Sequence, residues 1–256
     1  MRPLLALIRR EFTGYFLSPV GYVTLVFFLA ATGVLFFWAV GDLTRTGSQG
    51  IEYPFERLFG HWGFWVVFTF IPPLLTMRLL AEERGTGTLE TLLTAPIRDW
   101  QVVAGKFVGA VLFFVVMLTP TLVYLPVALS FDWSTRAFGI DPAYAWVSYL
   151  GLFLAGMMFL AVGLFVSSLV KNQLVAAMIS LAVSLLFVAP DFALNFFLDP
   201  DTGWAKAAEF LSVPDHFRRD FTRGVIDTRP VVLYLSVTAC CLYLTVRSLE
   251  ARRLRA

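Results

Sequence analysis

The chain has 256 residues, of which 58% are hydrophobic, 16% aromatic and only 15% charged, and its net charge is +2. Because soluble domains average roughly a quarter charged residues, this composition indicates an integral membrane protein, and the length leaves no room for a separate soluble catalytic domain beside several spans. The small net charge gives no electrostatic reason to expect nucleic-acid binding, so the 20 Lys and Arg residues are interpreted as topology signals.

The first predicted element is a helix over residues 3–17. Its apolar side chains share one side of a helical wheel: Leu4, Leu5, Ile8, Phe12, Tyr15 and Phe16. Arg9, Arg10 and Thr13 lie opposite, and Glu11 interrupts the pattern. We expect an interfacial helix on the cytoplasmic leaflet, with a basic flank of the first span as the simpler alternative. The apolar run that follows is too long for a signal peptide and is expected to stay as an anchor.

Six apolar segments follow, each able to cross a hydrocarbon core about 30 Å thick at roughly 1.5 Å per residue. They are predicted at residues 20–41, 61–80, 107–130, 145–170, 174–196 and 230–247. Pro72 and Pro73 in the second segment, and Pro120 and Pro126 in the third, are expected to kink their helices. The chain is therefore predicted to form one all-α polytopic transmembrane domain over residues 1–256.

The positions of Lys and Arg predict the orientation of these segments. Twelve of the 20 fall on the side that holds both termini and the 81–106 loop, and five of the other eight lie in the long connection at 197–229. Long connections count for less in the positive-inside rule, so both termini and the 81–106 loop are predicted to be cytoplasmic.

The 81–106 loop is the only long polar interruption between two strongly apolar runs. Leu89, Leu92, Leu93 and Pro96 recur at helical spacing among charged residues, and Gly85 and Gly87 allow a sharp turn before them. A short surface helix with this apolar ridge (Leu89, Leu92 and Leu93) suits docking into a partner's groove. An ordinary solvated loop is an equally weighted alternative on physical grounds alone.

The same loop carries a resemblance to a known family. The pattern Glu82-Glu83-x-x-Thr86-Gly87-Thr88-Leu89-Glu90-x-Leu92-Leu93-x-x-Pro96, followed by Gly105-Lys106, resembles the signature cytoplasmic loop of ABC-2 type transporter permeases. The resemblance implies a fold like that of type V exporters, with six spans behind an elbow helix, and a loop whose gate and coupling helices meet a separate ATPase subunit. It implies an ATPase-coupling or gating role for Glu82, Glu83, Gly87, Thr88, Leu89, Glu90, Leu92, Leu93, Pro96 and Lys106.

The fourth and fifth segments are joined only by residues 171–173, which predicts a tight helical hairpin. Ser167 and Ser168 can form hydrogen bonds locally or across helices. Three glycines of the fourth segment, expected to serve packing more than substrate contact, would allow close helix approach: Gly151, Gly156 and Gly163. The run from Leu164 to Ala176 also resembles the matching ABC-2 segment.

The connection at 197–229 is too aromatic for a plain tether. Short helices resting at the outer membrane interface are expected from its aromatic residues: Phe196, Phe197, Trp204, Phe210, Phe217 and Phe221. The pattern Leu211-Ser212-x-x-x-His216-Phe217-x-x-Phe221-x-x-Gly224-x-Ile226-Asp227-x-Arg229 resembles the gliding-motility (Gld) type branch of ABC-2 permeases. Pro230 departs from that branch, in which a polar or acidic residue is expected.

Residues suited to catalysis are not predicted to meet. His61 and His216 are expected across the membrane from Glu82 and Glu83, which argues against a metal site, and Gly87 stands where a CAAX-type membrane protease would carry Arg. The chain has no phosphate-binding loop ending in Gly-Lys-Ser/Thr.

The adjacent Cys240 and Cys241 are expected to be buried small hydrophobes. We therefore expect no enzyme activity and no cofactor in this chain, with ATP and Mg²⁺ bound by a partner subunit.

Together these features predict a multi-pass permease subunit of the bacterial inner membrane. It would couple ATP hydrolysis by an ABC ATPase dimer to export or extraction of a substrate, beside a second permease subunit that is the same or a related chain. An extracytoplasmic auxiliary subunit is left open as a further partner. The alternative is a non-transporting scaffold of a motility or envelope complex that docks an ATPase.

Overall fold

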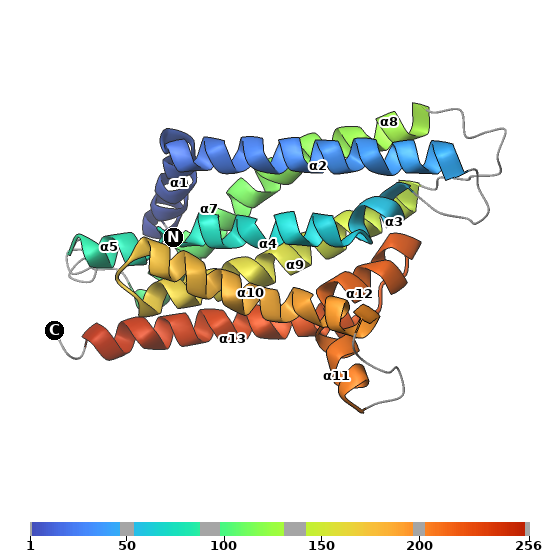
Figure 1. The fold of residues 1–256 in the computed structure, drawn as a ribbon. Helices are drawn as coiled ribbons and strands as arrows, with labels where there is room; N and C mark the ends of the chain where they lie inside the picture. The colour runs from blue at the N-terminus through green and yellow to red at the C-terminus, as the bar shows by residue number, and fades with distance from the viewer. Residues whose placement is uncertain (1, 47–53, 88–97, 131–141, 197–202, 254–256) are drawn as a thin grey trace.

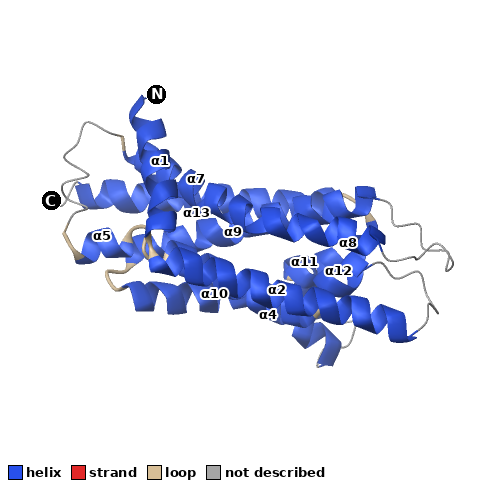
Figure 2. Cartoon of the chain, turned by 90° about the horizontal axis from the view of Figure 1, so that it is seen from above, coloured by secondary structure: helices blue, strands red, loops and turns tan. Residues whose placement is uncertain are grey.

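The computed structural model describes residues 2–46, 54–87, 98–130, 142–196 and 203–253. Within these ranges all regular secondary structure is helical (Figures 1 and 2). The elements are α1 (Arg2–Leu17), α2 (Pro19–Thr46), α3 (Pro54–Phe59), α4 (Trp62–Thr76), α5 (Ala81–Gly85), α7 (Asp99–Leu118), η1 (Thr119–Val123), α8 (Tyr124–Ser130), α9 (Pro142–Leu169), α10 (Gln173–Phe196), α11 (Gly203–Leu211), α12 (Val213–Arg219), η3 (Phe221–Arg223) and α13 (Thr228–Arg253).

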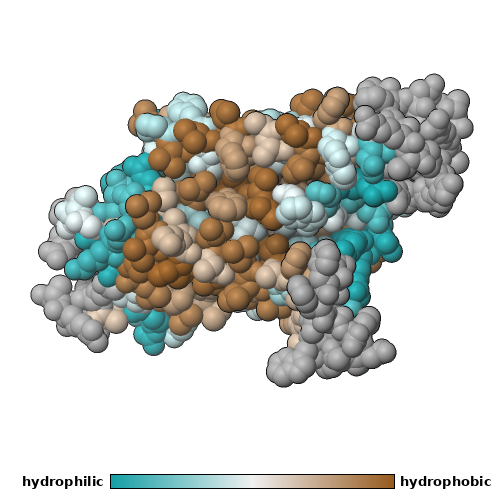
Figure 3. Space-filling view, in the orientation of Figure 1, coloured by the Kyte–Doolittle hydropathy of each residue, from teal (hydrophilic) through white to brown (hydrophobic). Residues whose placement is uncertain are grey.

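The long helices run along one common axis, and α1 crosses that axis at one end of the bundle (Figure 1). That end also holds α5, the first residues of α1 and the last residues of α13, whereas α3, α11 and α12 lie at the opposite end. An apolar surface covers the middle of the bundle, and hydrophilic residues gather at both ends (Figure 3). This distribution is that of a protein whose middle lies in lipid.

Five of the described helical segments are long and apolar enough to cross a membrane. They are Pro19–Asp42, Asp99–Val127, Tyr144–Leu169, Gln173–Ala193 and Thr228–Ala251. The segment predicted at 61–80 contains α4, whose 15 residues end at Thr76. At about 1.5 Å per residue, α4 is shorter than the hydrocarbon core. The six predicted spans are thus represented by five long helices and one short apolar helix.

The third span begins earlier than its predicted start at residue 107. Helix α7 begins at Asp99 because the Arg98 backbone N–H donates to Gln101 Oε1 at 3.2 Å, and because the Asp99 carboxylate stands in the positive first turn of the helix. Lys106 consequently lies within a helix, and the beginning of the 81–106 stretch is also helical, in α5. Pro120 lies in η1, the 3-10 segment that separates α7 from α8.

Helix α9 is the centre of the bundle and packs against α4, α7, α10 and α13. Its glycines make this packing possible. A Cβ atom on Gly151, Gly156 or Gly163 would overlap Phe221, Phe114 or Thr76, respectively. The prediction that these glycines permit close helix approach is therefore confirmed.

The connection after α10 forms short helices as predicted, namely α11, α12 and η3, but two of its aromatic residues are buried inside the protein. Phe217 and Phe221 are 0% exposed and belong to the core, where the Phe217 ring centroid lies 4.7 Å from that of Trp65. Beside them, Arg218 of α12 pairs with Asp191 of α10 at 2.7 Å. Phe210 is exposed, and the side chains of Phe196, Phe197 and Trp204 lie outside the described part of the chain.

Candidate functional site

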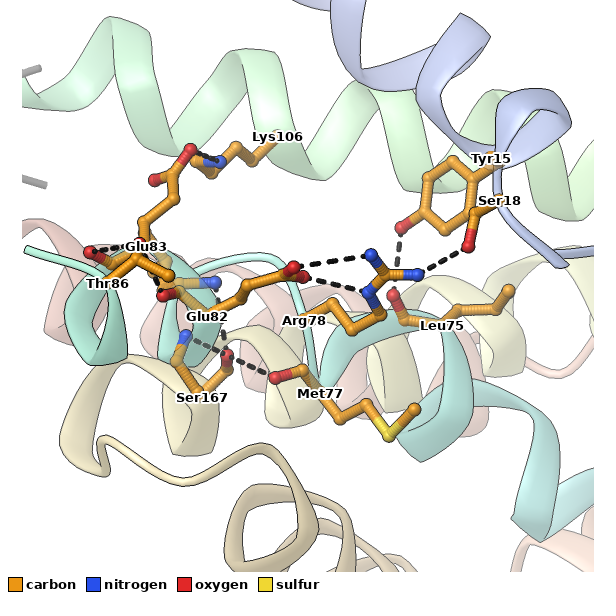
Figure 4. A network of polar contacts seen from close by, with 12 residues as sticks. Tyr15, Ser18, Leu75, Met77, Arg78, Glu82, Glu83, Thr86, Lys106 and Ser167 are labelled. Carbon is orange, nitrogen blue, oxygen red and sulfur yellow. Dashed lines mark hydrogen bonds and ion pairs between the residues drawn. The ribbon is translucent and has the colours of Figure 1, made fainter. Parts of the chain in front are cut away.

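A network of charged and hydroxyl side chains occupies the end of the bundle where α1 crosses it (Figure 4). Helix α1 contributes Glu11, helix α5 contributes Glu82 and Glu83, helix α7 contributes Lys106, and Arg78 lies in the turn before α5. Four separate stretches of sequence therefore meet at one place, and that place contains part of the predicted coupling loop.

Lys106 is the centre of this network. Its Nζ lies 3.0 Å from Glu11 Oε1 and 2.7 Å from Glu83 Oε1, while its side chain is only 1% exposed. Glu11 and Glu83 are 13% and 16% exposed. Such a buried cation is tolerated because both carboxylates pair with it, and removing any one of the three charges leaves the others in a medium of low dielectric.

Two glycines bring α1 close enough for this pairing. A Cβ on Gly105 would lie 2.6 Å from Leu7 Cδ2, and one on Gly109 would lie 2.8 Å from Glu11 Cβ. Gly105 and Gly109 are four residues apart and therefore share one face of α7. Because both lack side chains, α1 packs directly on α7 and presents Glu11 to Lys106.

Arg78 forms a second ion pair beside the first. Its Nε donates to Glu82 Oε2 at 2.8 Å and its Nη2 to Glu82 Oε1 at 3.3 Å, and its Nη1 donates to the Ser18 hydroxyl. The Tyr15 hydroxyl donates to the Leu75 carbonyl at 2.9 Å. Burial, assisted by the charge of Glu11, raises the pKa of Tyr15, so the phenol stays a neutral donor. These contacts join the α1–α2 junction to the α4–α5 turn.

Helix α9 holds the beginning of α5 from the other side. Ser167 Oγ accepts hydrogen bonds from the backbone N–H groups of Leu80 at 3.2 Å and Ala81 at 3.0 Å, and its hydroxyl lies 3.4 Å from the Met77 carbonyl (Figure 4). Arg84 donates to the Ser168 carbonyl. The expected cross-helix hydrogen bond is thus formed by Ser167, whereas the Ser168 hydroxyl bonds locally to Phe165.

The structure brings together some of the predicted coupling residues. Glu83 and Lys106 form an ion pair, Glu82 pairs with Arg78, and Gly87 has a φ of +75°, a conformation that favours glycine. The other predicted site residues lie outside the described residues: Thr88, Leu89, Glu90, Leu92, Leu93 and Pro96. Sequence reasoning missed Glu11, although its interruption of the amphipathic pattern of α1 was a signal that this face meets a cation.

A cleft of about 480 Å³ opens beside the network. Its apolar lining includes Leu74, Leu75 and Leu79 from the end of α4 and the turn that follows it. Its lining also carries charged groups, among them Arg10 and Arg78. The arrangement can hold a molecule with both polar and apolar parts, and it contains no nucleophile positioned by a base among the cleft residues.

Comparison with known proteins gives a match to the part of the chain that contains most of this site. Residues 45–213 match a family model described as an ABC-2 family transporter protein, which covers about two thirds of the chain. The match includes α4, α5, α7 and the stretch between them, whereas α1 precedes it. No curated protein matches the chain.

Proposed function

The chain belongs to the ABC-2 family of transporter proteins, and from that membership we propose that it is the permease subunit through which a separate ABC ATPase drives a substrate across a membrane. Members of this family generally work with such an ATPase. Long apolar helices and an apolar middle surface agree with a membrane-embedded subunit. Within this proposal the ATPase dimer supplies ATP and Mg²⁺, and the chain supplies the path and the mechanical response.

The observation that carries the proposal is the buried contact of Lys106 with Glu11 and Glu83. Glu83 stands in α5, where the family's loop pattern begins. A push on that segment reaches α7 and α1 through this ion pair, and it reaches α9 through Ser167. Closure of the ATPase dimer would thereby move the loop and tilt the first, second and fifth predicted spans.

The proposed residue roles follow from this placement. The apolar ridge of Leu89, Leu92 and Leu93, with Thr88, Glu90 and Pro96, would dock on the ATPase. Glu82, Glu83 and Lys106 would transmit its movement, and Gly87 would provide the turn between the two groups.

The assembly would hold two permease subunits, identical or related, on an ATPase dimer in a bacterial inner membrane. Both termini and the 81–106 loop would be cytoplasmic, with α1 as an interfacial elbow helix and the 1–256 chain as one six-span domain. The same proposal includes a closer relation to the gliding-motility type branch and an outer auxiliary subunit. It also includes export or extraction as the direction of transport.

The test is co-purification of the ATPase with the tagged, membrane-extracted chain. Substituting Leu89, Leu92 and Leu93 by Asp is expected to abolish ATPase association, because charged groups would enter an apolar docking groove. A matched control places Asp at three exposed apolar residues of the opposite bundle end, Phe210, Val225 and Ile226, and is expected to retain the ATPase.

The amount of each variant in the membrane is measured beside the pull-down. Equal ATPase recovery with the ridge variant and the wild type would overturn the docking role. Recovery of an ATPase whose turnover never responds to substrate would favour the scaffold alternative over transport.

A further inference from the structure

The cleft beside the charged network is lined by both apolar and charged side chains, from three parts of the chain. The apolar lining includes Leu74, Leu75 and Leu79, and the charged lining includes Arg10 and Glu11 of α1 and Arg78. Several residues of the charged network in Figure 4 belong to this lining. An occupant that contacts both kinds of side chain must be amphiphilic.

The charges around the cleft are balanced. Its lining includes the cations Arg10, Arg78 and Lys106, and the same number of carboxylates, from Glu11, Glu82 and Glu83. An occupant with a large net charge of either sign would therefore meet as much repulsion as attraction, whereas a zwitterion can set each of its charges against an opposite one.

The positive and negative groups of the lining differ in how far their neighbours already occupy them. Lys106 is buried and is shared between Glu11 and Glu83, so this group of three carries one excess negative charge. Arg10 is exposed. Each terminal nitrogen of Arg78 carries two N–H groups and uses one of them, Nη1 for Ser18 and Nη2 for Glu82, so one N–H on each can still donate to another acceptor. Arginine pairs well with phosphate because its planar fork donates two parallel hydrogen bonds.

The place of the cleft fits a lipid. It lies at the bundle end where the apolar middle surface gives way to hydrophilic residues, and Leu17 at its edge is 85% exposed. Lipid headgroups occupy this level of a membrane, and acyl chains continue from it along the apolar surface.

We propose that this cleft binds a phospholipid with a zwitterionic headgroup, whose phosphate contacts Arg78 and Arg10, whose amine faces the Glu11–Glu83 pair, and whose first acyl carbons lie on Leu74, Leu75 and Leu79. Binding at this site needs neither ATP nor the ATPase. Its failure would leave the permease function untouched, and loss of ATPase docking would leave lipid binding untouched.

The experiment measures lipid retained by the purified full-length chain, using native mass spectrometry after titration with defined lipids. Phosphatidylethanolamine is the main probe, phosphatidylglycerol tests the need for an amine, and soluble phosphoethanolamine tests the need for acyl chains. We expect phosphatidylethanolamine to bind at least about tenfold more tightly than either of the other two, as one charge-assisted hydrogen bond allows.

Two variants test the location. Arg78→Gln is expected to weaken phosphatidylethanolamine binding about tenfold. Gly14→Phe fills the cleft from α1, where an added Cβ meets no atom within 4 Å, so it blocks the site without disturbing the helix packing. Gly41→Phe is the matched control, since its Cβ also meets nothing within 4 Å and the residue does not line the cleft.

Loss of phosphatidylethanolamine with Gly14→Phe but not with Gly41→Phe supports the site. Equal retention by both variants, or equal binding of phosphatidylglycerol and phosphatidylethanolamine to the wild type, would overturn the proposal.

Discussion

The Nζ atom of Lys106 lies 2.7 Å from Oε1 of Glu83, which places a buried cation of α7 directly against the short helix α5. Glu11 approaches the same nitrogen from α1 at 3.0 Å. A movement of α5 therefore cannot leave α7 and α1 unaffected without separating buried charges. This contact makes the beginning of the predicted coupling loop part of the bundle's own framework.

The first prediction concerns the loss of this cation. Lys106→Met leaves the Glu11 and Glu83 carboxylates buried without their shared partner, and we expect the free energy of unfolding to fall by about 3–5 kcal/mol. Thermal unfolding of the purified chain measures the change.

The accompanying control neutralises all three groups with Lys106→Met, Glu11→Gln and Glu83→Gln together. Because no unpaired charge then remains, this triple variant is expected to recover most of the lost stability. A triple variant less stable than Lys106→Met would contradict the assigned ion-pair network.

The second prediction concerns the attachment of α5 to α9. Ser167→Ala removes the acceptor of the Leu80 and Ala81 N–H groups, so we expect a loss of about 1–3 kcal/mol and faster hydrogen exchange in the peptide around residues 77–85. Ser236→Ala is the control, because the exposed Ser236 hydroxyl bonds only within its own helix, to the Leu233 carbonyl. Unchanged exchange around residues 77–85 in the Ser167 variant would argue against this attachment.

The third prediction separates glycines that pack from glycines that do not. Gly163→Ala forces a methyl group into Thr76 and is expected to lower stability by about 1–3 kcal/mol. Gly14→Ala, in an exposed position of α1 with open space around the added atom, is expected to raise it by about 0.5–1 kcal/mol. Melting temperatures that shift in the same direction for both variants would refute this distinction.

The fourth prediction concerns pH at the opposite end of the bundle. Burial lowers the pKa of His216 below its usual 6.5, an effect that the nearby Asp215 carboxylate partly offsets, and His216 Nδ1 lies 3.0 Å from the Tyr234 hydroxyl. The unfolded chain therefore binds a proton before the folded chain does. The His216 contribution to stability is present above pH 6.5 and is lost as the pH falls below it.

Melting temperatures at pH 7.5 and 5.5 test this sign. The wild-type chain is expected to lose more stability on acidification than His216→Asn, and His61 is common to both chains. Burial raises the pKa of Asp220, whose contribution has the opposite sign and is also common to both. An equal or larger loss in the Asn variant would show that His216 does not control the response.

Local sequence was sufficient for much of the fold. Runs of about 20 apolar residues identified the long helices, and the three residues at 171–173 predicted the α9–α10 hairpin, since so short a connection leaves only an antiparallel neighbour. The residue pattern from Glu82 to Pro96, followed by Gly105-Lys106, was enough to suggest the family, which the match over residues 45–213 supports independently.

The partners of the site residues needed the tertiary structure. Glu11 and Lys106 are 95 positions apart, and their contact depends on how closely α1 approaches α7 at Gly105 and Gly109. Phe217 was expected at an interface because aromatic residues favour that region, but it is buried in the core, where its ring packs on Trp65 of α4. Neither outcome follows from the properties of a single segment.

The sequence by itself determined that this is a helical membrane protein of the ABC-2 family, because apolar run length and local motif depend only on neighbouring residues. Only the tertiary structure decided that Lys106 is a buried junction between α1, α5 and α7, and that a cleft with balanced charges opens beside it. Hydrophobicity places a segment in lipid, but it does not fix which faces of two helices meet. That choice is made by shape and charge complementarity between residues far apart in the chain.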